Sequence, residues 1–134
     1  MRVTWDEYFL QIAKAVSQRS TCIRRQYGAV IVQDYTIVST GYNGSARGET
    51  NCIDTGSCER EELGIPPGQN YELCNSVHAE ANAIINCDPV KMGGATMYIA
   101  GCNKDGSPAN AEPCLMCARM LKNAKIKRIV KGER

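Results

Sequence analysis

Two short segments, His-Ala-Glu from residue 78 and Pro-Cys-x-x-Cys from residue 113, place the strongest constraint on how this chain can fold. One imidazole and two thiolates are three of the four ligands that zinc takes in a tetrahedral site, and they leave one position for water. Cys114 and Cys117 would lie on one side of a first helical turn. His78 and Glu80 diverge along the side of a helix and converge only over its end. The spacing therefore predicts two helices whose N-termini face one zinc ion.

Glu80 is the predicted catalytic residue, and His78, Cys114 and Cys117 are the predicted ligands of a catalytic zinc. A carboxylate that stays off the metal can take a proton from the zinc's water and pass it on. A Cys-x-x-Cys pair alone is equally typical of half a structural zinc site or of a redox pair. Here it combines with the only histidine of the chain, an adjacent proline and two expected helix starts. This joint pattern favours a hydrolytic site.

The composition limits the kind of protein to which these segments belong. The 134 residues predict a single domain over 1–134, and a net charge of +2 does not require a polyanionic partner. Few aromatic residues argue against a stacking platform for nucleic acid, which is not expected as a partner. An acidic start and the lack of an apolar run of roughly 18 residues predict neither a signal peptide nor a membrane span. Eight cysteines then indicate a cytoplasmic protein whose thiolates bind metal.

Hydrophobic periodicity predicts strands that alternate with helices after a first hairpin, which is typical of an α/β layered sheet. A capping box at Thr4 and Glu7 starts the first helix, and Gln33-Asp34 forms the hairpin turn. The expected helices cover 4–18, 77–87 and 113–124, and the expected strands cover 29–32, 36–40, 95–100 and 126–130.

The second expected helix begins after Asn75 or Ser76, either of which can act as its N-cap. Ala81, Ile84 and Ile85 recur at helical spacing, so they are predicted to form its buried face.

The segment from Gly44 to Asn75 shows no strong period, which is unusual in a compact domain unless something other than a core orders it. Four thiolates could close a tetrahedral structural zinc and order this segment. The alternative is that some of these cysteines are buried small apolar residues, as free cysteines often are. Cys87 and Cys102 are expected to be packing residues. The predicted ligands of the structural zinc are Cys22, Cys52, Cys58 and Cys74.

With these residues in place, the chain resembles the deoxycytidylate (dCMP) deaminases of the cytidine deaminase superfamily. His-x-Glu followed by Pro-Cys-x-x-Cys is the signature of zinc-dependent nucleobase deaminases. Gly-Tyr-Asn-Gly at 41–44 and the cysteine-bearing segment after it are more specific to the dCMP branch. The other segments that carry the resemblance are 5–9, 19–22, 27–32, 78–84 and 94–98.

The resemblance implies a three-layer α/β/α fold with a mixed central sheet. It implies that dCMP and water give dUMP and ammonia, by attack of a zinc-bound hydroxide with Glu80 as the proton shuttle, which supplies dUMP for thymidylate synthesis. It places Asn43 against the deoxyribose and the Ala79 backbone against the base. It also implies a second zinc near Cys22 and Cys52.

Regulation and assembly follow from the same resemblance. Members of the family are often hexamers or dimers, activated by dCTP and inhibited by dTTP, and Mg²⁺ can accompany a nucleotide effector. The substrate phosphate needs cations, and Arg25 and Arg47 lie in the expected pocket loops, along with Arg24 and Lys104. Arginines in loops are also often simply solvated surface.

Two other functions fit part of the pattern. One is a tRNA adenosine deaminase or another nucleobase deaminase, which would need a wide basic groove. The other is a non-catalytic, zinc-stapled module linked to DNA uptake. Glu80 argues against the second alternative, because a purely structural zinc site has no use for a carboxylate that is not a ligand.

Overall fold

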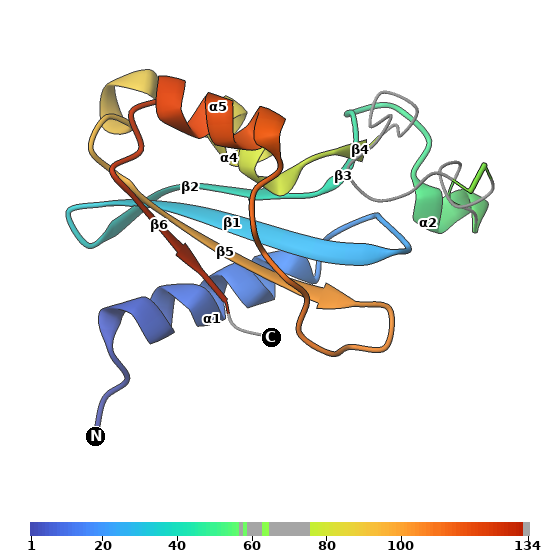
Figure 1. The fold of residues 1–134 in the computed structure, drawn as a ribbon, viewed down its shortest axis with the longest axis horizontal. Helices are drawn as coiled ribbons and strands as arrows, with labels where there is room; N and C mark the ends of the chain where they lie inside the picture. Colours follow the sequence, from blue (N-terminus) through green and yellow to red (C-terminus); the bar gives the residue numbers. More distant parts are fainter. Residues whose placement is uncertain (57, 59–62, 65–75, 133–134) are drawn as a thin grey trace.

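Four strands form one mixed sheet at the centre of the molecule (Figure 1). The computed structural model describes residues 1–56, 58, 63–64 and 76–132. The strand order is β2-β1-β5-β6, in which β1 pairs antiparallel with both β2 and β5, and β5 pairs parallel with β6. The strands are β1 (Arg25–Gln33), β2 (Thr36–Tyr42), β5 (Thr96–Asn103) and β6 (Arg128–Lys131).

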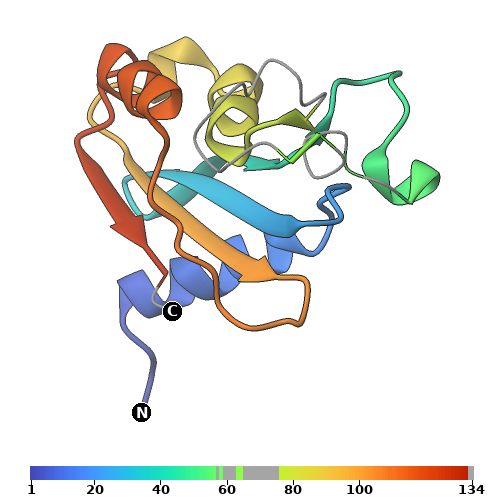
Figure 2. The ribbon, with the colours of Figure 1, turned by 45° about the vertical axis from the view of Figure 1, so that its right-hand side comes forward.

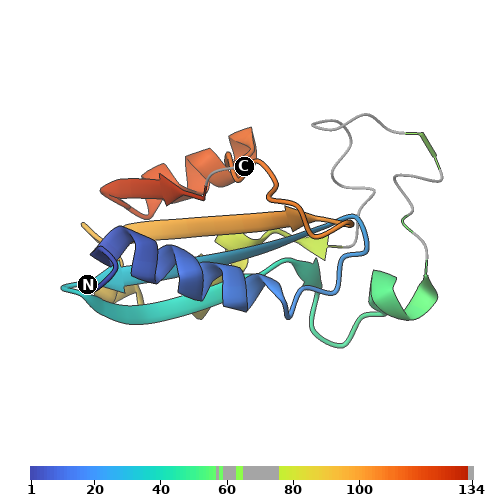
Figure 3. The ribbon, with the colours of Figure 1, turned by 90° about the horizontal axis from the view of Figure 1, so that it is seen from below.

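Helices cover both faces of this sheet, which confirms the three-layer α/β/α arrangement. Helix α1 (Trp5–Ser17) lies on one face, and α4 (Ala79–Asn86) and α5 (Leu115–Asn123) lie on the other (Figures 1 and 3). Successive side chains of β1 point to opposite faces, so Ile31 joins the core under α4 and α5, whereas Val30 joins the core under α1. Because β1 is buried on both faces, its sequence is a continuous apolar run.

Short elements lie beyond the end of the sheet that carries Tyr42 (Figure 2). Strand β3 (Gly44–Ser45) pairs antiparallel with β4 (Ser76–Val77), and α2 (Cys52–Thr55) is a single helical turn. A 3₁₀ turn, η2 (Pro89–Lys91), follows α4. The small β3–β4 ladder matters because it delivers the chain directly to residue 78.

Two glycines allow the helices to pack closely against the hairpin. A Cβ atom at Gly28 would lie 2.1 Å from the Ala13 carbonyl oxygen of α1, and one at Gly41 would lie 2.3 Å from the Ala83 nitrogen of α4. Real Cβ atoms essentially never come within 3.0 Å of such atoms. The β1–β2 hairpin therefore packs against α1 on one face and against α4 on the other, with backbone atoms of helix and strand in close contact.

The predicted elements are all present, and the differences lie at their ends. The Thr4 hydroxyl accepts a hydrogen bond from the Glu7 N–H at 3.1 Å, as the predicted cap requires. The hairpin turn is Asp34-Tyr35, not Gln33-Asp34, since both residues have positive φ (53° and 60°), as a type I′ turn needs.

The prediction for the second helix was wrong in two respects. The helix begins at Ala79 with His78 in the N-cap position, because Ser76 and Val77 are held in the β3–β4 ladder. Ile85 is 67% exposed, whereas Ala79, Ala81 and Ala83 are buried. Ile84 does pack against the core, so the buried face lies toward the alanines and away from Ile85.

In the part of the chain that the structure describes, no helix combines the length and apolar character that crossing a membrane requires.

Candidate active site

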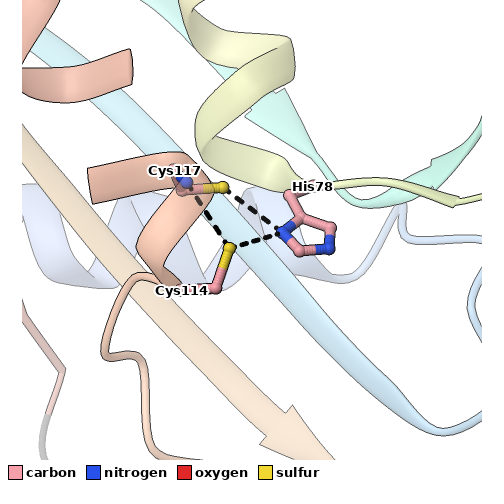
Figure 4. Close-up of side chains that lie close together, drawn as sticks. All are labelled: His78, Cys114 and Cys117. Atoms are coloured by element: carbon pink, nitrogen blue, oxygen red, sulfur yellow. Dashed lines mark hydrogen bonds between the residues drawn. The ribbon is translucent and has the colours of Figure 1, made fainter. Parts of the chain in front are cut away.

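The N-termini of α4 and α5 meet at one point above the sheet (Figure 4). His78 occupies the N-cap position of α4, and Cys114 occupies that of α5. The Cys114 sulfur accepts a hydrogen bond from the Cys117 N–H at 3.4 Å, as an N-cap side chain does. The Nδ1 atom of His78 lies 3.3 Å from the Cys117 sulfur and 3.5 Å from the Cys114 sulfur. The structure thus brings together the three residues that the spacing paired.

These donor atoms fit a tetrahedral zinc ion. Zinc bonds of about 2.3 Å to sulfur and about 2.0–2.1 Å to nitrogen, at tetrahedral angles, require nitrogen and sulfur donors roughly 3.6 Å apart. The observed separations from His78 are close to that value. Among the described residues, His78, Cys114 and Cys117 are the one group of three potential ligands whose donor atoms all lie within 4.8 Å of one another.

Glu80 lies in the first turn of α4 and is buried, with 7% of its surface exposed. Burial raises the pKa of its carboxyl, and hydrogen bonds with its own backbone N–H and with Cys117 oppose this rise. A carboxyl group with a raised pKa exchanges protons more easily near neutral pH than an ordinary glutamate does. The Glu80 carboxyl thus lies beside the Cys117 donor.

Cys117 behaves differently from what its place on a helix predicts. A helix N-terminus favours a thiolate, yet burial and the neighbouring Glu80 and Cys114 raise the pKa of the Cys117 thiol. Acidic groups crowded together in this way disfavour one another's charge. A divalent cation among them reverses that balance, since it deprotonates a coordinating thiol outright. The electrostatics therefore fit a cation site.

A cavity of about 160 Å³ opens beside these residues. Asn43 and Ala79, two of the predicted substrate contacts, line it together with His78 and Glu80. The Asn43 side chain is buried and bridges two backbone groups at the start of β1, since its Oδ1 accepts from the Tyr27 N–H at 2.8 Å and its Nδ2 donates to the Arg25 carbonyl at 2.9 Å. Asn43 therefore braces the cavity wall in addition to facing the cavity.

The predicted cations separate into two places. Arg25 lines the cavity beside Glu80, and so does its neighbour Arg24. Arg47 instead lines a second hollow of about 310 Å³, where it donates to the Asn86 Oδ1 at 2.7 Å. The structure thus brings Arg25, but not Arg47, to the cavity that contains Glu80.

The second group of cysteines is only partly assembled. Cys22 and Cys58 both line the cavity beside Glu80. The Ile53 N–H donates to the Thr21 carbonyl at 3.1 Å, which brings the chain next to Cys52 to the chain next to Cys22. Within the described ranges, these three sulfurs do not form a cluster as tight as that at His78. Cys74 and the predicted cap Asn75 lie outside the described residues.

Sequence reasoning missed part of the cavity wall. Tyr27, Ala111 and Glu112 line the cavity, although no pattern assigned them a role. Tyr27 stands directly before the apolar run of β1, and Ala111 and Glu112 directly precede the Pro-Cys-x-x-Cys segment. Their adjacency to these two motifs was the one signal that could have found them.

The arrangement of helix N-termini, ligands and buried glutamate is matched by a family model. The model of the cytidine and deoxycytidylate deaminase zinc-binding region covers residues 3–133. The chain belongs to this family. The match extends over the sheet, both flanking layers and every described residue of the cavity.

Curated members of this deaminase family are similar along most of the chain. A deoxycytidylate deaminase of Mycobacterium phage D29 is 40% identical, with 96% of this chain and 94% of the relative covered. A deoxycytidylate deaminase of Schizosaccharomyces pombe is 34% identical over 96% of this chain, which spans only 37% of that longer protein.

Among solved structures of the family, a dCMP deaminase of the cyanophage S-TIM5 in complex with dCMP and dUMP matches with a TM-score of 0.67. It is 27% identical, and the match covers 98% of this chain and 82% of that one. The mixed sheet with helices on both faces is therefore the fold of this deaminase family.

Proposed function

We propose that this chain hydrolyses dCMP to dUMP and ammonia. The observation that carries the proposal is the buried Glu80 carboxyl, which lines one cavity together with His78 and Cys114, two of the three zinc donors. The relative from Mycobacterium phage D29, which matches this chain along nearly its whole length, is a deoxycytidylate deaminase, and the cyanophage relative was solved in complex with dCMP and dUMP.

Glu80 moves the protons of this reaction. When bound by the three donors, zinc acidifies a coordinated water and so supplies a nucleophile near neutral pH. Glu80 accepts the water proton and delivers protons to the pyrimidine ring nitrogen and to the departing ammonia. Its raised pKa suits both steps, and its burial excludes the bulk water that would exchange these protons.

The remaining groups of the cavity hold the nucleotide. Ala79, in the first turn of α4, presents its backbone to the base. The amide of Asn43 retains one N–H and one lone pair after its two bonds to β1, and these bind the deoxyribose. Arg25, together with Arg24, supplies positive charge for the phosphate at the cavity rim.

The proposal includes a second zinc, with Cys22, Cys52, Cys58 and Cys74 as its structural ligands. The backbone bond between Ile53 and Thr21 supports it, since it draws two of the four ligand segments together. We further propose a cytoplasmic homo-oligomer, a hexamer or a dimer, with dCTP and dTTP as effectors and Mg²⁺ as a companion of the effector nucleotide.

The decisive experiment measures ammonia release and the absorbance change with dCMP, CMP, deoxycytidine and dCTP as substrates, with and without dCTP and dTTP as effectors. We expect turnover of dCMP, raised by dCTP and lowered by dTTP. Lack of turnover on every cytosine nucleotide, in protein that contains zinc, would refute the proposal. Deamination of adenosine in a tRNA anticodon substrate but not of dCMP would establish the nucleobase alternative, and DNA binding without turnover would establish the non-catalytic one.

A further inference from the structure

Tyr27 lies where three parts of the cavity wall meet, and the chemistry proposed above gives it no role. It sits near the start of β1, opposite Gly101 of β5. Its backbone exchanges hydrogen bonds with Asn43, which accepts from the Tyr27 N–H at 2.8 Å and donates its own N–H to the Tyr27 carbonyl at 3.3 Å. Its side chain lines the cavity.

The position of the Tyr27 ring depends on the absence of a side chain on the neighbouring strand. A Cβ atom at Gly101 would lie 2.4 Å from Cδ1 and 2.5 Å from Cε1 of the ring. Directly opposed residues on antiparallel strands pack against each other when both have side chains. Here the glycine leaves room for the ring to lie against the backbone of Gly101.

The hydroxyl of Tyr27 reaches the segment that forms the opposite wall. It donates to the Asn110 carbonyl at 3.1 Å, and the Asn110 Oδ1 accepts from the Glu112 N–H at 3.2 Å. Ala111 and Glu112 line the cavity, and the zinc donor Cys114 follows two residues later. A chain of contacts thus runs from β1 through Asn110 to the wall.

Several other contacts also hold this wall, and Ala111 belongs to the main hydrophobic core. Residues 109–114 contain no helix or strand, so the segment is placed by individual bonds and by burial of its small side chains. The Ala109 N–H donates to the Gly101 carbonyl at 3.0 Å, and on the outer side the Glu112 carboxylate pairs with Lys131 of β6. The exposed bond from the Tyr27 hydroxyl to Asn110 adds a contact from a residue that itself lines the cavity.

We propose that Tyr27 is a positioning residue that sets the Ala111–Glu112 wall against the bound nucleotide. The inference rests on the proposed function. Tyr27 does not touch the reacting atoms, so it acts on the affinity for substrate and not on the proton transfers at Glu80. A residue that only filled space in the core would change the melting temperature and leave the KM for dCMP unchanged.

The first test removes one oxygen atom. Tyr27→Phe keeps the ring over Gly101 but cannot bond to Asn110, and a net hydrogen bond corresponds to roughly a two- to tenfold change in affinity. We expect the KM for dCMP to rise by that factor, with kcat and zinc content unchanged. Tyr35→Phe is the matched control, because Tyr35 is exposed in the β1–β2 turn and packs against Trp5.

The second test moves the ring itself. Gly101→Ala forces the Tyr27 ring aside, so we expect a larger rise in KM than Tyr27→Phe gives. Gly93→Ala is the control, since a Cβ there meets nothing within 4 Å and the backbone needs no positive φ. In a Tyr27→Val background the clashing ring atoms are gone, and the KM effect of Gly101→Ala should shrink. The 3.2 Å contact of the new Cβ with the Gln26 carbonyl remains in both backgrounds, so the double-mutant cycle removes it.

An unchanged KM in Tyr27→Phe, or an equal effect of Gly101→Ala with and without the ring, would overturn the inference. Loss of kcat or of zinc at constant KM would overturn it as well. If Gly101→Ala does not fold, Tyr27→Phe decides alone. Failure of the proposed function is distinguishable, because the unmodified protein would then not turn over dCMP at all.

Discussion

Two groups of cysteines in this molecule were predicted to bind zinc, and they differ in how much regular structure surrounds them. Cys114 and Cys117 lie at the start of α5. The Cys117 N–H donates a hydrogen bond to the Cys114 sulfur, and Cys117 is 1% exposed. Cys22 follows α1 in a loop, and Cys52 begins the four-residue helix α2, whose N-cap Asn51 makes no side-chain capping bond.

The comparison indicates which of the predicted zinc donors the fold itself holds in position. At His78, Cys114 and Cys117, the backbone is held by helices packed on a four-stranded sheet, so we expect the donors to be in place before any metal binds. Around Cys22 and Cys52, the backbone bond from Ile53 to Thr21 draws the two segments together. We expect that zinc bound there would order the chain, as it does in small zinc-stabilised domains. The first site should therefore affect chemistry, and the second should affect stability.

The largest effect is expected from Glu80→Gln. This change removes the carboxyl proposed to transfer protons and keeps the three zinc donors His78, Cys114 and Cys117. Loss of acid–base help alone costs roughly 10²–10⁴ in rate, so kcat for dCMP should fall by at least this much, with zinc content unchanged. Glu7→Gln, a change of an exposed carboxylate in α1, is the control. Activity retained in Glu80→Gln, measured by ammonia release, would refute the assigned role.

Cys117→Ser tests whether the first region is assembled without its metal. We expect bound zinc to fall by about one ion per chain and activity to be lost, while far-UV circular dichroism stays that of the folded protein, because zinc sites need the full donor set but this backbone does not need zinc. Cys102→Ser, outside the donor group, should keep both zinc and activity. Global unfolding of Cys117→Ser would show that the two regions do not differ as described.

Cys52→Ser is the matching change in the second region. It should lower stability and leave kcat nearly unchanged, whereas Cys117→Ser should remove activity and leave the fold intact. The zinc content should fall and the melting temperature should drop by about 5 °C or more, as loss of one or more kcal/mol does in a domain of this size. The kcat of the folded protein should be nearly preserved. An unchanged zinc count, measured by metal analysis, would exclude Cys52 as a ligand.

The smallest effect is expected where α1 meets β6, a contact held by side chains without metal. The Asp6 carboxylate accepts from Arg128 at 3.0 Å and from the Tyr98 hydroxyl at 2.7 Å. The bonds from Arg128, and then the one from Tyr98, lower the pKa of Asp6, whereas burial and then Asp6 raise the pKa of Tyr98 to about 12.

The sign of the pH dependence follows from these two shifts. The contribution of Asp6 is present above its ordinary pKa near 4 and is lost as the pH falls through its lowered value. That of Tyr98 is present below about pH 10 and is lost as the pH rises towards 12. Asp6→Asn should therefore lower the melting temperature by a few degrees at most between these limits and by less at the acid end. A constant difference at every pH would contradict the assignment.

Much of the fold followed from local patterns, and the misses have local causes. The apolar run of β1 and the cap at Thr4 identified their elements because burial and capping act within a few residues. The start of α4 was misplaced because Ser76 is held by Ser45, a pairing that no local pattern reveals. Ile85 was expected inside because its spacing fits, but the side of α4 that faces the core carries Ala79, Ala81, Ala83 and Ile84 instead.

The residues of the site also fall into those that local patterns predict and those that depend on distant parts of the chain. The donors and Glu80 were predictable because zinc chemistry restricts both residue type and spacing. The place of Arg47 was not, since its partner Asn86 lies on α4, far along the chain. Tyr27 was missed for a related reason: its significance depends on Gly101, whose contribution is the absence of a side chain.

The close approach of α4 to Gly41 has a consequence for how far the active site extends. A Cβ at residue 41 would also come within 2.5 Å of the Ala79 carbonyl and 2.8 Å of the Asn82 carbonyl carbon. Any side chain there would lift the first turn of α4 away from the sheet, and the His78 ring and the Glu80 carboxyl would move with it. The distance of the Glu80 carboxyl from the sheet is thus set by the absence of a Cβ atom at Gly41 of β2. A change at Gly41 would impair catalysis without contacting metal, water or nucleotide.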